Sequence, residues 1–158
     1  MSGELHRIAE ISLDDEGCTG RKSETLQERA AAICDLLSEN SFAPVSGRSG
    51  PFHLRIGIEE ARLKIAIRSG SDGSSEMVLL ALAPLRRIIR EYLNLCDSYN
   101  EALKGPQLRG LEAIDFGRRA LHNEGSERLL AELAPKVAVD HETARRLFTL
   151  ISVLQRRG

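Results

Sequence analysis

The chain has 158 residues, of which 42% are hydrophobic, and its formal net charge is −1. This length and apolar content predict one globular domain, residues 1–158, with a single core. A near-neutral charge excludes the strong general attraction to nucleic acid or to an anionic membrane that a basic protein has. The charge is divided unevenly, because residues 1–83 carry a net charge of −4 and residues 84–158 one of +3.

The first half, residues 1–83, is expected to be rich in strands and to hold one helix. Alternating apolar and polar residues indicate a strand over Leu5–Leu13, and a polar loop over Asp14–Ser23 follows. Thr25 and Glu28 form a capping-box pair, which predicts the start of a helix. The buried stripe of this helix is expected to be Leu26, Ala30, Ile33 and Leu37.

A strong sheet signal follows a loop over Ser41–Pro51. Apolar residues alternate with polar ones over 52–58 and again over 62–68, and the short link Glu59–Ala61 predicts a hairpin with one buried face. A third strand over Glu76–Leu82 returns alongside it. Together these segments predict an antiparallel meander of three to four strands.

From Pro84 on, the pattern becomes helical. Proline suits the first position of a helix, and apolar residues then recur at spacings of four and three up to Lys104. This long helix is expected to cover the buried face of the sheet, although its stripe also suits pairing with a second copy, so the oligomeric state stays open. The stripe consists of Leu85, Ile89, Tyr92, Cys96, Tyr99 and Leu103.

Three shorter helices are expected to complete this half. They run over Gln107–His122, over residues 127–134 and, after a short strand at Lys136–Val139, from an Asp140 cap to the end of the chain. The predicted class is therefore α+β: the meander packed against a long helix, with a helical C-terminal half.

The cysteines predict a reducing compartment. Cys18, Cys34 and Cys96 are odd in number, widely spaced and without metal-type pairing. The last two fall on helical stripes, so buried thiols are expected there. Because the N-terminus lacks a signal pattern and no apolar run reaches membrane-spanning length, a cytoplasmic protein without a membrane segment is expected.

Residues 114–127 hold the densest group of chemically capable side chains. Most of them fit a corner between two helices, with Gly125 in a left-handed turn and Ser126 capping the next helix. Gly117 within a helix indicates a close approach by another element or a ligand. Asp115 is spaced to pair with one of the following arginines, and Glu124 has no evident structural task.

The same run also favours a site for an anion. Guanidinium groups bind phosphate and carboxylate through paired hydrogen bonds, and a second arginine pair lies on the last helix. The candidate ligand-binding residues are Arg118, Arg119, His122, Asn123, Arg145 and Arg146. A non-catalytic binding or regulatory protein that holds a small anion or an acidic protein partner is one hypothesis. The alternative is an enzyme acting on a phosphorylated or carboxylated metabolite, with His122 as acid/base and Glu124 or Asn123 orienting it.

Other chemistries find little support in the pattern. Ligand spacing typical of a metal site is missing around His122, and no nucleotide-binding fingerprint or nucleophile elbow is present, so neither a metal nor a cofactor is expected. One further cluster, Arg86-Arg87-Arg90, lies in the first turns of the long helix, where the helix dipole disfavours positive charge. This mismatch indicates an acidic partner.

The chain resembles the uncharacterised protein family 0262 of alphaproteobacteria over nearly its full length. The resemblance implies a cytoplasmic bacterial protein, and because no activity, cofactor or catalytic residue is assigned to that family, it transfers no site residue. It is carried by Glu28-Arg29-Ala30 through Glu39-Asn40-Ser41-Phe42, Gly50-Pro51, Ser98-Tyr99, Ile114-Asp115, Gly117-Arg118-Arg119, Leu121-His122-Asn123-Glu124-Gly125-Ser126-Glu127 and Thr143-Ala144-Arg145-Arg146-Leu147-Phe148-Thr149-Leu150-Ile151.

Overall fold

The computed structural model describes residues 5–14, 23–105 and 110–156. Cys18, most of the predicted loop over 14–23 and the predicted helix start at Gln107 lie outside these residues. The elements in chain order are β1 (Ile8–Asp14), α2 (Ser23–Ser38), β2 (Phe42–Pro44), β3 (Phe52–Glu59), β4 (Arg62–Ser69), β5 (Ser75–Ala81), α3 (Ala83–Lys104), α4 (Leu111–Leu133), β6 (Val137–Val139) and α5 (His141–Leu154).

Strands β3, β4 and β5 form the predicted antiparallel meander. The β3–β4 turn consists of Glu60 and Ala61, whose φ angles of 51° and 62° are those of a hairpin turn that matches the twist of the strands. The fourth strand, β1, pairs in parallel with β3, so the sheet is mixed and has the order β1-β3-β4-β5. The parallel pairing arises because helix α2 carries the chain back between β1 and β3.

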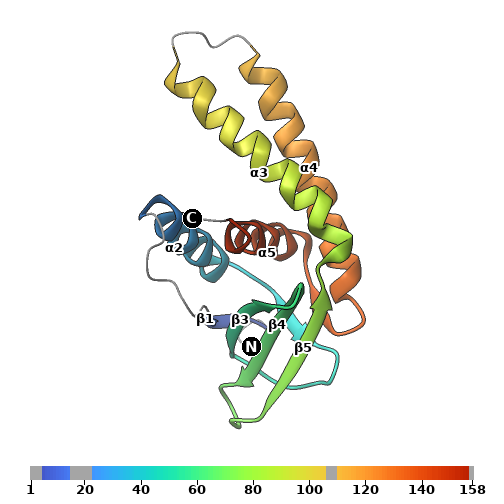
Figure 1. Ribbon diagram of the computed structural model, residues 1–158. Helices are drawn as coiled ribbons and strands as arrows, with labels where there is room; N and C mark the ends of the chain where they lie inside the picture. Colours follow the sequence, from blue (N-terminus) through green and yellow to red (C-terminus); the bar gives the residue numbers. More distant parts are fainter. Residues whose placement is uncertain (1–4, 15–22, 106–109, 157–158) are drawn as a thin grey trace.

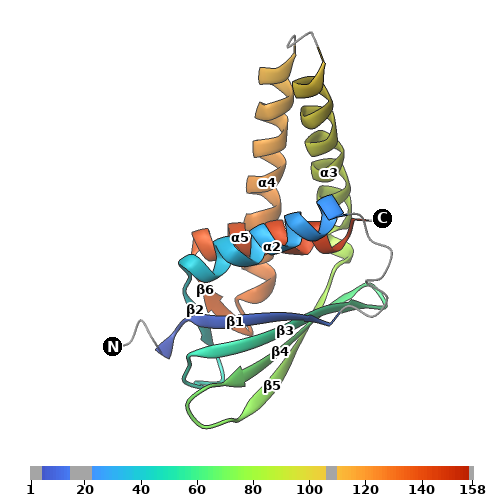
Figure 2. The ribbon, with the colours of Figure 1, turned by 90° about the vertical axis from the view of Figure 1, so that its left-hand side faces the viewer.

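Helices α2 and α5 cover one face of this sheet, whereas α3 and α4 form a hairpin that projects from it (Figures 1 and 2). Helix α3 has 22 residues, which at 1.5 Å per residue is roughly 33 Å. Only its first three turns reach the core, where Leu85, Ile88, Ile89 and Tyr92 are buried. The expectation that the long helix covers the sheet therefore holds for these turns alone; beyond them α3 packs along α4, and Leu103 is 51% exposed.

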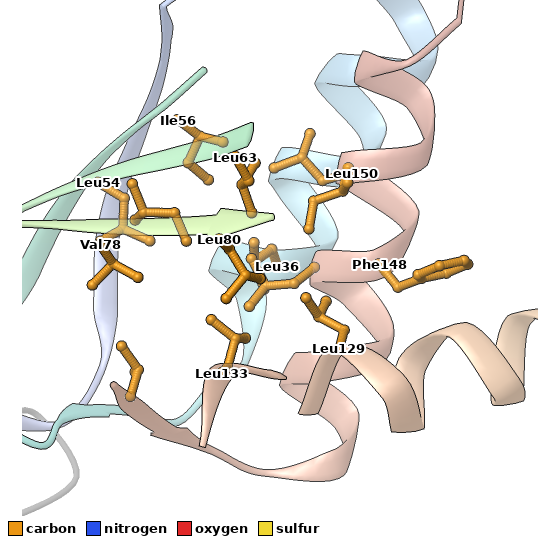
Figure 3. Close-up of a cluster of buried hydrophobic side chains, with 14 of the residues drawn as sticks. Leu36, Leu54, Ile56, Leu63, Val78, Leu80, Leu129, Leu133, Phe148 and Leu150 are labelled. Atoms are coloured by element: carbon orange, nitrogen blue, oxygen red, sulfur yellow. The ribbon is translucent and has the colours of Figure 1, made fainter. Parts of the chain in front are cut away.

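The core lies between the sheet and the helices, as Figure 3 shows. Phe148 of α5 points away from the strands (Figure 3) and is fully buried. Helix α5 therefore packs on two sides, against the sheet and against the α3–α4 hairpin. The side chains that meet at the sheet include Leu36, Leu54, Ile56, Leu63, Val78, Leu80, Leu129, Leu133 and Leu150.

The predicted corner at Asn123–Ser126 is wrong, because α4 continues through it as one helix from Leu111 to Leu133. Gly125 is used for packing instead of turning: a Cβ atom at this position would lie 2.2 Å from the Phe148 ring. Ser126 does not cap a new helix, and its hydroxyl donates to the His122 carbonyl one turn earlier, at 2.7 Å. The signals of a helix end are here signals of a close helix–helix contact.

Two short strands tie the halves of the chain together. The segment over 41–51, expected to be a loop, contains β2, which pairs antiparallel with β6. Strand β6 and the Asp140 cap after it confirm the prediction, since the Asp140 carboxylate accepts from the Thr143 amide at 2.8 Å.

The buried stripe of α2 is displaced from the predicted one, because each buried position lies one residue earlier in the sequence. Leu26 is 45% exposed, and Cys34, expected to be buried, is also exposed. Both possible stripes have helical spacing, and the tertiary contacts select the one that includes two polar residues. The buried positions are Thr25, Arg29, Ala32 and Leu36.

Candidate functional site

Three helices contribute to a small hollow on the side of α5 away from the sheet. Helix α4 places Arg118 and His122 on one face, one turn apart, with Arg119 beside them. Helix α5 adds Arg145, and α3 adds Tyr92. The cavity volume is about 370 Å³, and its lining residues are Tyr92, Arg118, Arg119, His122 and Arg145. We call it the His122 hollow.

The imidazole of His122 is held in place on three sides. Its ring centroid lies 5.3 Å from that of Tyr92 and 5.3 Å from that of Phe148, and its Nε2 atom lies 2.7 Å from the Thr149 hydroxyl. That hydroxyl donates its proton to the Arg145 carbonyl at 3.2 Å. It therefore accepts from the Nε2 proton of His122, and the lone pair of the imidazole is on Nδ1.

The free lone pair is buried. Nδ1 of His122 has no hydrogen-bond partner in the described part of the chain. Burial, followed by the charges of Arg145 and Arg118, lowers the pKa of His122 from 6.5 to about 4. The side chain is thus a neutral imidazole at neutral pH.

The positive charge of the hollow is only partly compensated. Asp115 is shared by two guanidinium groups: its Oδ1 lies 3.2 Å from Nε of Arg118 and its Oδ2 lies 3.1 Å from Nε of Arg119. The hydrogen bond from Arg118 lowers the pKa of this carboxyl. Arg145 contacts Glu142 only at 4.0 Å, and the Glu142 side chain is 68% exposed.

A tyrosine ring and an amide orient two of the three arginines. The Arg118 guanidinium lies 4.7 Å over the ring of Tyr99, and one Arg145 nitrogen donates to the Asn123 side-chain oxygen. Asn123 therefore holds Arg145 rather than lining the hollow itself.

Two sequence-derived candidates lie elsewhere. Arg146 donates to the Glu39 carbonyl at 2.5 Å and so ties α5 to the end of α2. Glu124 lies 3.1 Å from Arg87, which also pairs with Glu91 at 2.6 Å, so this carboxylate joins α4 to α3. Neither side chain is among the residues that line the hollow.

Gly117 has a packing role, since a Cβ atom there would lie 3.1 Å from the Leu95 side chain of α3. Sequence reasoning missed Tyr92 and Thr149 as parts of the site. The sequence pattern places Tyr92 on the apolar stripe of the long helix and gives no sign of a second role. For Thr149, the one signal in the sequence is its spacing of one helical turn from Arg145.

Two further observations concern metal binding and membrane spanning. Within residues 5–14, 23–105 and 110–156, no three His, Cys, Asp or Glu side chains come together in a way that would hold a metal ion. In the same ranges, every helix is too short or too polar to cross a membrane.

Comparison with known proteins identifies relatives over almost the whole chain. A sequence model described as "Uncharacterised protein family (UPF0262)" matches residues 5–157. A UPF0262 protein of Rhodopseudomonas palustris (strain BisB18) is 49% identical over 152 residues, covering 96% of this chain and 93% of its own. Others from Erythrobacter litoralis (45% identical, 97% and 98% covered) and Rhizobium etli (strain CIAT 652; 44% identical, 96% of each covered) are similar. No solved structure matches the chain.

Proposed function

Because the chain belongs to the uncharacterised protein family UPF0262, whose name states no activity, we propose a function from the hollow itself: the protein binds a small anion there and acts as a non-catalytic binding or regulatory protein. The observation that carries this proposal is the meeting of Arg118, Arg119 and Arg145 around one hollow.

The charges of the hollow suit a phosphate or a carboxylate. A single shared carboxylate, Asp115, faces both Arg118 and Arg119, and the contact of Arg145 with Glu142 is long and exposed. Guanidinium donors that keep unused hydrogen-bonding positions favour an oxyanion, which accepts several charge-assisted hydrogen bonds at once. The volume of about 370 Å³ suits a small metabolite.

Acid–base catalysis by His122 receives less support. A general acid or base works best when its pKa is near the working pH, whereas that of His122 is lowered to about 4. Glu124, the other catalytic candidate, pairs with Arg87 outside the hollow. The imidazole instead suits a positioning role, as part of the wall that holds the arginines around the hollow.

We further propose that this binding takes place in the cytoplasm. The thiols of Cys34 and Cys96 are free, which fits a reducing compartment. An acidic protein partner that inserts a carboxylate into the same hollow is the other form of the proposal, and the experiment below separates the two.

The test is an NMR titration of the His122 ring with and without inorganic phosphate, at constant ionic strength set with chloride. A phosphate bound beside His122 raises the pKa of the imidazole, because its negative charge favours the protonated form. The chain has 4 histidines, so the other three serve as internal controls. A His122 titration that phosphate leaves unchanged, together with an unchanged melting temperature, rules out small-anion binding and leaves only the acidic partner.

Matched variants on one helix test the arginines. Arg119 pairs with Asp115 and Arg128 pairs with Glu132, both at a spacing of four residues on α4. We expect Arg119→Gln to reduce the rise in melting temperature that phosphate produces, and Arg128→Gln to leave that rise intact. Equal loss in both variants would mean that phosphate acts on the general surface charge.

A further inference from the structure

A second and larger hollow lies at the start of α3, between that helix, the β3–β4 turn and the end of α5. Figure 2 shows these three segments on the same side of the molecule. The volume is about 690 Å³. We call it the Arg86 groove; its lining residues are Ile58, Ala61, Leu82, Arg86, Ile89, Arg90, Leu93, Asn94, Asp97, Gln155 and Arg156.

One face of α3 forms a wall of this groove. The lining positions of the helix, 86, 89, 90, 93, 94 and 97, recur at spacings of three and four residues. Arg87 lies outside this face and pairs with Glu124 of α4. The groove and the His122 hollow are therefore distinct sites on different sides of α3.

Two guanidinium groups of the groove are uncompensated. Neither Arg86 nor Arg90 forms an ion pair in the described part of the chain, and both side chains are exposed. The first turn of α3 holds no acidic residue, so these charges lie near the positive end of the helix dipole without a counter-charge. A bound anion would offset this unfavourable arrangement.

Apart from the side-chain amides of Asn94 and Gln155, the rest of the groove is apolar or already paired. Half-buried Ile58 and Leu93 and the exposed Ala61 present hydrocarbon surface. Arg156 is bound on both sides, by Glu28 at 2.9 Å and by Asp97 at 2.9 Å, so its charge is already compensated. The unpaired charge and the apolar surface thus lie next to each other.

We propose that the Arg86 groove binds an amphiphilic anion: a carboxylate or phosphate head group held by Arg86 and Arg90, with a short hydrocarbon or aromatic body against Ile58, Ala61 and Leu93. A small inorganic ion would leave the apolar surface unused, and a neutral apolar molecule would leave the guanidinium groups without a partner. The volume lies in the range of sites for small organic ligands, about 300–1,000 Å³.

The experiment is a titration of the isotope-labelled protein followed by amide and arginine Nε–H NMR signals. The probes are octanoate, octyl phosphate, octanol and acetate, the first two below their micelle-forming concentrations. We expect octanoate, octyl phosphate or both to shift signals of Arg86, Arg90 and Leu93. Whichever of these two probes binds more tightly identifies the preferred head group, carboxylate or phosphate. Octanol and acetate at equal concentration bind at least about tenfold more weakly, because each lacks one half of the interaction.

Two variants on the same turn of α3 provide the control. Arg90→Gln is expected to weaken the binding by about tenfold, the effect of losing one charge-assisted hydrogen bond. Arg87→Gln, which removes a guanidinium that faces α4, leaves the binding within about twofold.

Three results would overturn the proposal: equal binding of octanol and octanoate, an Arg90→Gln variant that binds as well as the wild type, or shifts confined to Arg118, His122 and Arg145. The last result would still support anion binding in the His122 hollow. Conversely, shifts at Arg86, Arg90 and Leu93 with an unchanged His122 titration would support the groove and contradict the hollow. The two sites are therefore tested separately.

Discussion

Replacing Gly125 by alanine sets two physical effects against each other. In a helix interior, alanine is more favourable than glycine by about 1 kcal/mol, so helix propensity predicts a more stable protein. The new methyl group, however, would lie 2.2 Å from two atoms of the Phe148 ring. Phe148 is fully buried, and its ring packs against Tyr92 and His122, so it has no open space into which to move.

The packing effect is expected to prevail. Overpacking a core costs about 1–3 kcal/mol, and a contact this short belongs at the upper end of that range. After subtraction of the gain in propensity, we expect Gly125→Ala to lower the free energy of unfolding by about 2 kcal/mol. For a chain of this size, this corresponds to a melting temperature lower by about 4–8 °C.

The same helix offers a matched control. At Gly117 the added methyl group would lie 3.1 Å from one terminal methyl of Leu95, a flexible side chain. Gly117→Ala is therefore expected to be neutral or to stabilise the protein by up to about 1 kcal/mol. Urea unfolding followed by circular dichroism measures both variants.

A double variant distinguishes packing from backbone strain. Phe148→Leu removes the ring, so Gly125→Ala should be much less destabilising in that background, with a coupling energy of about 1–2 kcal/mol. An equal loss in both backgrounds would refute the packing explanation, and so would a Gly125→Ala variant as stable as Gly117→Ala.

Three other predictions concern single groups. The pKa of His122 is lowered to about 4, so the contribution of its neutral imidazole to stability is complete above pH 6.5 and is lost as the pH falls toward 4. The urea midpoint of the wild type should therefore drop over this window by more than that of His122→Asn. Parallel pH profiles of the two proteins would contradict the lowered pKa. Asp140→Ala should destabilise the protein by about 0.5–2 kcal/mol in thermal unfolding, whereas Asp140→Ser retains most of the cap; equal losses in the two variants would exclude capping. Exposed Cys34 should react with iodoacetamide much faster than Cys96, whose pKa is raised by burial, as judged by mass spectrometry of the labelled peptides, and the reverse order would contradict the described exposures.

Elements whose pattern repeats along the backbone were predictable from the sequence. The hairpin of β3 and β4 follows from strict alternation, and the 22-residue helix α3 follows from a repeat of three and four that runs from Leu85 to Leu103. The Asp140 cap is a local interaction over three residues. In each case the residues that define the element are also the residues that stabilise it.

The α4 helix shows where local signals fail. Gly125 and Ser126 match the residue preferences of a helix end, and nothing nearby in the sequence distinguishes that role from close packing. The deciding residue, Phe148, lies 23 positions further along the chain and reaches Gly125 only after α4 and α5 have packed.

The candidate site divides in the same way. By itself, the sequence determined that Arg118 and His122 share one face of a helix, because a spacing of four residues is one turn. Only the tertiary structure decided between the adjacent residues Arg145 and Arg146. Neighbouring helical positions point about 100° apart, so one guanidinium lines the His122 hollow while the other binds the Glu39 carbonyl. Which of the two faces the hollow depends on how α5 is rotated against the sheet, and that rotation is set by the core residues of all the packed elements together.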